Sequence, residues 1–127
     1  MISASGSPPS PTVLVVDDDT DLRDTLGELL VEEGYDAQTC ENGQAALARL
    51  REGGLSPRLI LLDLMMPVMN GWQFREQQLQ DARLREIPVV VMTASRGLDG
   101  APLRAQEILY KPVGLGELLD AVERNLR

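Results

Sequence analysis

Short runs of aliphatic residues recur along this chain, and most of them stop abruptly at a polar residue. The longest uninterrupted runs are Val13 to Val16, Leu59 to Leu62 and Val89 to Met92, with a briefer one from Ile108 to Tyr110. Runs without alternation are typical of strands buried on both faces, as in the centre of a parallel sheet. Tyr35 to Cys40 instead alternates, so it is predicted to be an edge strand.

Apolar residues at helical spacing separate these predicted strands. Helices are expected from Asp19 or Thr20 to Gly34, from Gly43 to Gly53, from Trp72 to about Ala82, and across the leucines from Leu115 to Leu126. Residues 95 to 106 contain two glycines and a proline, which leave room for at most a short or irregular fourth helix. Strands alternating with helices predict an α/β fold with a doubly wound parallel sheet.

The carboxyl ends of the predicted strands carry the residues with reactive side chains. Five strands are expected in the order 2-1-3-4-5, the flavodoxin-like arrangement, in which ligands bind where the first and third strands are neighbours. Asp17 to Asp19 follow the first strand, and Asp63 follows the third. Thr93 and Lys111 end the fourth and fifth strands. We therefore expect all of these side chains to meet at one pole of the sheet.

Length and cysteine usage indicate a single domain from a reducing compartment. The 127 residues are expected to form one domain over residues 13 to 127, preceded by a disordered tail or linker over residues 1 to 12. This tail lacks the features of a signal peptide, and no apolar run reaches membrane-spanning length. The single cysteine, Cys40, is interpreted as a packing residue. These features favour a cytoplasmic location.

Charge and missing residue types narrow the possible chemistry further. A net charge of -8 and a pI near 4.4 argue against direct binding to nucleic acid or to an anionic membrane, so the expected partners are proteins and cations. The absence of histidine excludes histidine-based triads, zinc hydrolysis and a phosphohistidine on this chain. Lys111 is the only lysine beside eleven arginines, which makes it a candidate for a site that needs a compact ammonium.

The carboxylates at the predicted pole indicate a cation site. Closely spaced carboxylates repel one another unless a cation joins them. The available ligands are all oxygens, including backbone carbonyls after Asp63, so we expect a hard cation: Mg²⁺ first, then Mn²⁺ or Ca²⁺. Beside such a cation Asp63 can act as a nucleophile toward phosphorus, with Lys111 and Thr93 stabilising the phosphoryl oxygens.

Four motifs, in this order, resemble the receiver domain of two-component response regulators. They are Val15-Val16-Asp17-Asp18, Leu62-Asp63-Leu64-Met65-Met66-Pro67 with Asn70-Gly71, Met92-Thr93-Ala94, and Tyr110-Lys111-Pro112. The resemblance covers residues 13 to 127. The sequence gives no output domain after Arg127, so we expect either a stand-alone receiver of the chemotaxis type or a receiver fragment of a larger regulator or hybrid kinase.

The resemblance also implies roles for individual residues. Asp63 would be the phosphoacceptor, Asp17 and Asp18 would hold Mg²⁺ with the backbone carbonyl of Met65, Asp18 being the more direct ligand, and Thr93 and Lys111 would contact the phosphoryl group. The Lys111-Pro112 bond is often cis in this family. The partners implied are a sensor histidine kinase or a histidine phosphotransfer protein, and a downstream protein target. Such a domain promotes its own aspartyl phosphorylation and dephosphorylation but is not a turnover enzyme.

Two departures from the family pattern concern signalling. The position three before the lysine usually holds an aromatic switch residue coupled to the threonine, and here it is Ile108. The stretch between Thr93 and Lys111 is also about one helical turn shorter than usual. We therefore expect phosphorylation to order residues 95 to 105 while Ile108 changes little, because its β-branched side chain is restricted at χ1.

Other functions remain open from the sequence. A degenerate receiver that only binds a partner is compatible with Ile108. A phosphohydrolase of the haloacid dehalogenase type would need Thr or Val at Asp21 and a longer chain. A calcium loop starting at Asp17 would need glycine at Leu22, and a flavin-binding relative would need hydroxyls and glycine after the first strand.

Overall fold

The computed structural model describes residues 11–94 and 103–126. In this part of the chain, five parallel strands form one sheet in the order β2-β1-β3-β4-β5, which confirms the predicted doubly wound α/β architecture. The strands are β1 (Thr12–Val16), β2 (Asp36–Cys40), β3 (Leu59–Asp63), β4 (Val89–Thr93) and β5 (Glu107–Tyr110). The helices are α1 (Thr20–Glu32), α2 (Gly43–Arg51), α3 (Gly71–Gln80) and α4 (Leu115–Leu126).

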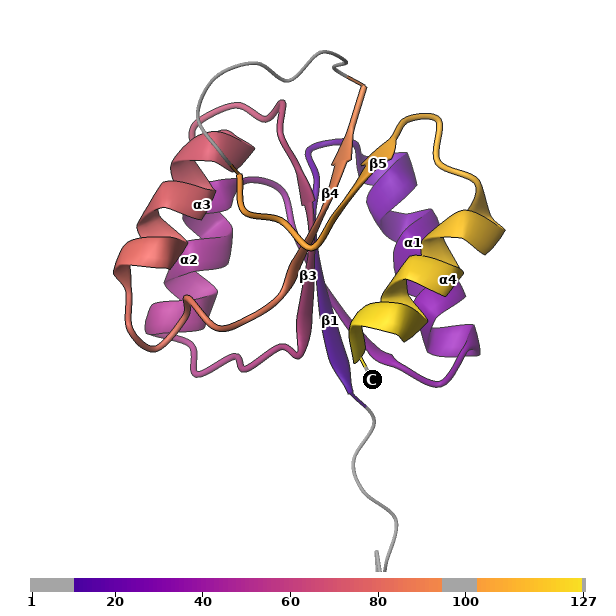
Figure 1. Cartoon of the computed structure of the whole chain (residues 1–127), viewed down its shortest axis with the longest axis horizontal. Helices are drawn as coiled ribbons and strands as arrows, with labels where there is room; N and C mark the ends of the chain where they lie inside the picture. Colours follow the sequence, from indigo (N-terminus) through magenta and orange to yellow (C-terminus); the bar gives the residue numbers. More distant parts are fainter. Residues whose placement is uncertain (1–10, 95–102, 127) are drawn as a thin grey trace, which may run out of the picture.

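Helices cover both faces of the sheet. In Figure 1, α2 and α3 lie on one face, and α1 and α4 lie on the other. The sheet is therefore sandwiched between two helical layers, and its strand ends are the places where polar side chains can gather.

None of the helices in the described part of the chain has both the length and the apolar character of a membrane-spanning segment.

Two predicted segments lie wholly or largely outside the described residues. The first is the N-terminal tail, of which residues 1–10 are not described; β1 begins at Thr12, one residue before the predicted domain boundary. The second is the short or irregular helix expected between β4 and β5, which falls largely on residues 95–102. Residues 103–106 lead into β5 without forming a helix. The label α4 therefore names the helix that follows β5, not the helix expected between β4 and β5.

The core consists of two apolar layers divided by the sheet. Alternate side chains of the central strands point to opposite faces, as the period of two along a strand requires. Leu14, Ile60 and Leu62 pack with residues of α2 and α3, whereas Val15 and Leu61 pack with residues of α1 and α4. All residues of β3 and β4 are buried, which explains their continuous apolar runs.

The turn from β3 into α3 brings two backbone segments unusually close together. Asn70 caps α3 by accepting a hydrogen bond from the Gln73 N–H, and the Gln73 side chain accepts one from the Asn70 N–H. The Gly71 N–H donates to the Leu64 carbonyl at 2.9 Å. A Cβ on Gly71 would lie 2.6 Å from the Asp63 carbonyl oxygen and 2.7 Å from the Leu64 Cα, so glycine is required here.

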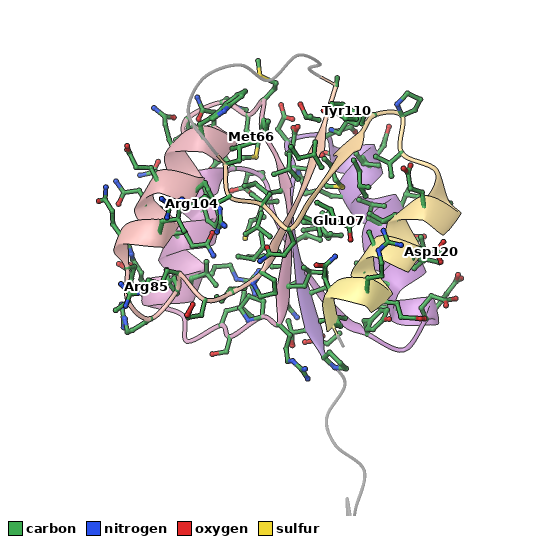
Figure 2. The ribbon with its side chains drawn as sticks, in the orientation of Figure 1. Met66, Arg85, Arg104, Glu107, Tyr110 and Asp120 are labelled. Atoms are coloured by element: carbon green, nitrogen blue, oxygen red, sulfur yellow. The ribbon has the colours of Figure 1, made fainter. Side chains whose placement is uncertain are left out.

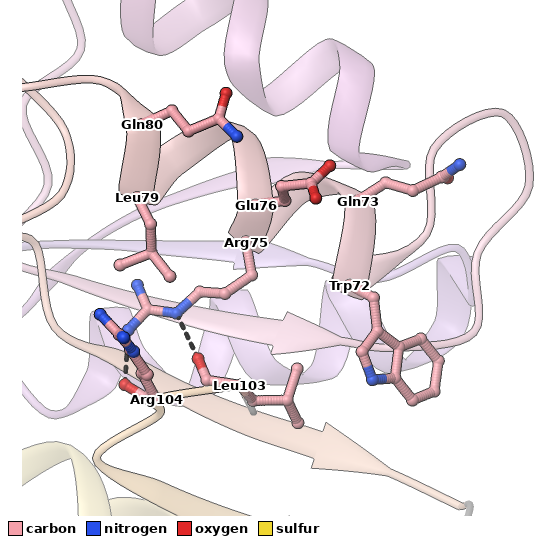
Figure 3. Close-up of a pocket in the computed structure, with 8 residues that line it drawn as sticks. All are labelled: Trp72, Gln73, Arg75, Glu76, Leu79, Gln80, Leu103 and Arg104. Atoms are coloured by element: carbon pink, nitrogen blue, oxygen red, sulfur yellow. Dashed lines mark hydrogen bonds between the residues drawn. The ribbon is translucent and has the colours of Figure 1, made fainter. Parts of the chain in front are cut away.

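Polar contacts tie β5 to the helices on both faces. On one face, Glu107 of β5, which is labelled in Figure 2, points toward α4. It accepts hydrogen bonds from Arg124 and Asn125 of that helix. On the other face, Arg75 of α3 is buried and donates to the Leu103 carbonyl at 2.7 Å and to the Arg104 carbonyl at 2.5 Å (Figure 3). The segment that leads into β5 is therefore attached to α3.

The Arg75 contacts continue through a second buried polar side chain. Arg75 donates to Gln78 Oε1 at 2.8 Å, and Gln78 Nε2 donates to the carbonyls of Leu84 and Ile87. Burial, together with the charge of Arg104, lowers the pKa of the Arg75 guanidinium. These bonds connect the segment before β4 with the segment before β5. They satisfy polar groups that would otherwise be costly to bury.

Gly71→Ala is expected to destabilise the protein by about 2 kcal/mol, because the new Cβ would overlap the backbone at the end of β3. Gly27→Ala is the matched control: Gly27 lies within α1, where the nearest atom to a new Cβ is a Thr39 methyl at 3.9 Å. This control should stabilise the protein by up to about 1 kcal/mol through helix propensity. Urea denaturation followed by circular dichroism measures both changes. Equal stability of Gly71→Ala and the unmodified chain would contradict the close approach.

Candidate functional site

Three carboxylates meet at the carboxyl ends of β1 and β3. These strands are neighbours, with Val16 opposite Leu62, so the residues that follow each of them are brought side by side. One carboxylate oxygen from each of Asp17, Asp18 and Asp63 lies within 4.8 Å of the others. Asp17 and Asp63 are buried, and Asp18 is exposed. The predicted cluster of acids at the topological switch point is therefore present in the geometry.

Lys111 reaches the same cluster from the end of β5. Its Nζ lies 2.8 Å from Asp17 Oδ2 and 3.6 Å from Asp63 Oδ1. Burial lowers the pKa of the Lys111 ammonium, but its hydrogen bond to Asp17 and the charges of the three carboxylates outweigh burial and raise that pKa. The ammonium is thus held in its charged form between two buried carboxylates. One positive charge faces three negative ones.

This imbalance of charge contributes to a raised pKa of Asp63. Burial, followed by the negative charge of Asp17, raises the pKa of Asp63 from 3.8 to about 6. The Lys111 ammonium and a hydrogen bond from the Met65 N–H act in the opposite direction without cancelling the shift. In the absence of a second cation, Asp63 therefore keeps its proton to a higher pH than an ordinary aspartate does.

The residue types around the cluster fit a hard divalent cation. The three carboxylates offer only oxygen atoms, at separations that one ion can bridge. A divalent cation would supply the positive charge that Lys111 leaves uncompensated. The cluster is thus consistent with the metal site predicted from the sequence.

The remaining predicted site residues lie in the loop after β3 and on strands β4 and β5. Met65 follows Asp63 in an exposed loop, and Thr93 is fully buried at the end of β4, one residue beyond the Asp63 partner Met92. The Lys111 N–H donates to the Thr93 carbonyl at 2.8 Å, so the two strand ends are joined. Ile108 lies in β5 and is 37% exposed. The segment that was expected to become ordered on phosphorylation, residues 95 to 105, lies largely outside the described residues.

Asp19 does not join the acid cluster that was expected to include it. Its side chain caps α1 instead, accepting a hydrogen bond from the Leu22 N–H at 3.2 Å. A second contact was not anticipated at all: Arg23 Nη1 donates to the Asp17 carbonyl at 2.7 Å. The only sequence signal for it is an arginine four residues after the helix cap, on the same face of the helix.

Comparison with known proteins agrees with this geometry. Residues 13–123 match the family described as response regulator receiver domain. The chain belongs to this family. It is 39% identical over 120 residues to the transcriptional regulatory protein CpxR homolog of Haemophilus influenzae, covering 91% of this chain and 50% of that protein. It is 35% identical over 121 residues to the sensory transduction protein RegX3 of Mycobacterium tuberculosis. The receiver chain spans about half the length of the curated relatives that it matches.

Solved receiver structures share the fold. The chemotaxis response regulator CheY4 of Vibrio cholerae superposes with a TM-score of 0.83 at 27% identity, covering 92% of this chain and 99% of that chain. The receiver domain of a histidine kinase from Syntrophus aciditrophicus superposes with a TM-score of 0.80 at 27% identity, covering 92% and 90% of the two chains. The Lys111-Pro112 peptide bond is cis in this receiver, as the resemblance predicted.

We predict that the stability of the metal-free receiver falls as pH rises through the titration of Asp63. The folded-state pKa of about 6 lies above the ordinary value of 3.8, so this group's contribution is present below pH 4 and lost as pH rises through 6. Asp63→Asn removes the titrating carboxyl group and with it this pH-dependent contribution to stability. Relative to wild type, the variant should gain on the order of 2 kcal/mol in free energy of unfolding between pH 4 and pH 7.5.

Urea denaturation in EDTA at several pH values measures this difference. Mg²⁺ at pH 7.5 should then stabilise the wild type more than Asp63→Asn, because the ion offsets the charge that the variant already lacks. Parallel pH profiles for the two proteins would contradict the assigned titration.

Proposed function

We propose that this receiver accepts a phosphoryl group on Asp63 in a reaction that depends on Mg²⁺, with Mn²⁺ as a substitute. The observation that carries the proposal is the grouping of three carboxylates and one ammonium within contact distance at the strand ends. Asp17 and Asp63 both belong to the carboxylate cluster and both contact Lys111, and the resemblance to the family assigns the acceptor role to Asp63. Receiver domains are in general phosphoacceptors and not turnover enzymes, and this chain has the residues that such a role requires.

The proposed roles follow from position and charge. Asp17, Asp18, Asp63 and the backbone carbonyl of Met65 would hold the ion, which when bound neutralises charge on the phosphoryl oxygens. The Lys111 ammonium stabilises the same developing charge, and the Thr93 hydroxyl is proposed to hydrogen-bond a phosphoryl oxygen. These groups are held by strand ends before the reaction. The site therefore needs little reorganisation when charge develops.

The proposed transfer exchanges one bond for another. An Asp63 carboxylate oxygen forms a P–O bond with phosphorus while the P–N bond of a phosphohistidine on the partner breaks, and the electron pair of that bond stays on the imidazole. The raised pKa of Asp63 would return toward its ordinary value once a divalent cation joins the cluster, so the attacking carboxylate would stay ionised to a lower pH.

The proposed partners are proteins. We infer that a sensor histidine kinase or a histidine phosphotransfer protein supplies the phosphoryl group in the cytoplasm, and that the phosphorylated receiver changes its interaction with a downstream protein target. Thr93 and Ile108 are the proposed switch residues. A degenerate receiver that binds its partner without phosphorylation is a weaker alternative, because Asp63, Lys111 and both members of the acidic pair are retained.

We predict that acetyl phosphate labels Asp63 and no other residue, and only when a divalent cation is present. Borohydride reduction followed by peptide mass spectrometry locates the acyl phosphate. Asp63→Asn should remain unlabelled, and EDTA should abolish labelling of the wild type. A phosphoryl group on another residue, or equal labelling of Asp63→Asn, would overturn the assignment.

Lys111→Arg is expected to slow phosphorylation by about tenfold, because a wide planar guanidinium cannot replace a compact ammonium between Asp17 and Asp63. The 2.8 Å and 3.6 Å contacts of Lys111 leave little room for the larger group. The rate of labelling by acetyl phosphate measures the effect, and exposed Arg85→Lys serves as the control. A wild-type rate in Lys111→Arg would show that charge alone is sufficient.

A further inference from the structure

Asp18 lacks the contacts that fix the other acids of the cluster. Asp63 accepts a hydrogen bond from the Met65 N–H, and Asp17 is bonded to the Asp19 N–H and to Lys111. Within the described part of the chain, no group donates a hydrogen bond to the Asp18 carboxylate or forms an ion pair with it. This carboxylate is also the most exposed of the three. Its direction is therefore set by the backbone that carries it.

The backbone that carries Asp18 is held by Arg23. The carbonyl of the peptide group between Asp17 and Asp18 accepts a 2.7 Å hydrogen bond from Arg23 Nη1, and Arg23 Nη2 lies 3.4 Å from Thr20 Oγ1. The Arg23 N–H bonds to the Asp19 carbonyl, so the arginine itself is anchored in the first turn of α1. Rotation of the peptide between the two acids would break the contact with the guanidinium.

Arg23 also leaves the acids free for another cation. It stands in the most acidic stretch of the chain, yet no carboxylate among the described residues lies within ion-pair distance of its guanidinium. Its hydrogen bonds go to a carbonyl and a hydroxyl instead. The arginine therefore restrains the loop without neutralising Asp17 or Asp18.

We propose that Arg23 is a positioning residue for the divalent cation: by fixing the peptide between Asp17 and Asp18, it orients the Asp18 carboxylate toward the cluster. The proposal rests on the proposed function, because it requires a cation at this site. Residues that orient metal ligands commonly contribute ten-fold or more to metal affinity, since a ligand that is already oriented loses less freedom on binding.

The sign of the effect separates positioning from simple electrostatics. Arg23 carries a positive charge near the site, so its removal would strengthen cation binding if charge alone mattered. Loss of positioning would weaken binding. Arg23→Met, which keeps the length of the side chain but has neither charge nor donor, is therefore expected to raise the Mn²⁺ dissociation constant about tenfold. Arg23→Lys, which keeps a donor and the charge, should recover most of the affinity.

The experiment is a titration of the full chain with Mn²⁺, followed by electron paramagnetic resonance of the free ion, with Mg²⁺ as competitor. Arg49→Met is the matched control, because Arg49 also donates to a carbonyl at a strand end, that of Thr39, and its loss changes the net charge equally. It should stay within about twofold of wild type. Urea denaturation in EDTA establishes that each variant folds. Arg23→Leu, which also lacks both charge and donor, replaces Arg23→Met if that variant does not fold.

The outcomes distinguish this inference from the function on which it rests. Weaker binding in Arg23→Met, with recovery in Arg23→Lys, supports positioning. Unchanged or tighter binding in a folded Arg23→Met variant overturns the inference and leaves the proposed function intact. Absence of Mn²⁺ binding by the wild type would overturn both.

Discussion

Repulsion among three carboxylates at the ends of two neighbouring strands is the constraint on which this receiver depends. One carboxylate oxygen from each of Asp17, Asp18 and Asp63 lies within 4.8 Å of the others, and two of these acids are buried. Among the residues that the structure describes, the Lys111 ammonium is the positive charge paired with them. A flexible chain would separate these charges. The sheet prevents this because β1 and β3 are paired from Val13 and Leu59 up to Val16 and Leu62, and their ends cannot move apart without breaking ladder hydrogen bonds.

The structure around the cluster serves to keep it in place. Gly71 allows the first turn of α3 to lie against the backbone of Asp63 and Leu64, and the Asn70 cap fixes where that helix begins. Across the pole, Asp19 caps α1 and Arg23 holds the Asp17 carbonyl. The acids thus stand between two helix starts, each fixed by its own cap. This rigidity makes a cation favourable at the site, because binding relieves repulsion without the cost of assembling the ligands.

Away from the cluster, β5 is the element through which a change at the pole could reach the surface. It carries Lys111 at its end, is tied to α4 through Glu107, and is joined to α3 through the buried Arg75. Ile108 lies on this strand and is partly exposed. Its small, stiff side chain offers less surface to expose or hide than an aromatic ring. Signalling through this strand is therefore expected to rely on the backbone more than on a rotating side chain.

The sequence by itself determined the order of strands and helices, the parallel sheet and the pole at which the reactive residues gather. These features follow from local periodicity and from the rule that parallel strands present their carboxyl ends on one edge, so short segments suffice to predict them. The sequence also predicted that Asp19 or Thr20 begins the first helix, and Asp19 caps α1.

The tertiary structure alone decided which partner each charged side chain and hydrogen-bond donor contacts. Lys111 lies closer to Asp17 than to Asp63, and Arg23 donates to the Asp17 carbonyl although several carboxylates are close to it in the sequence. Arg75, charged and therefore expected at the surface, is buried because carbonyls of a distant segment meet it there. Such choices depend on ångström differences between competing partners from separate parts of the chain. Residue type and spacing carry no information on those distances.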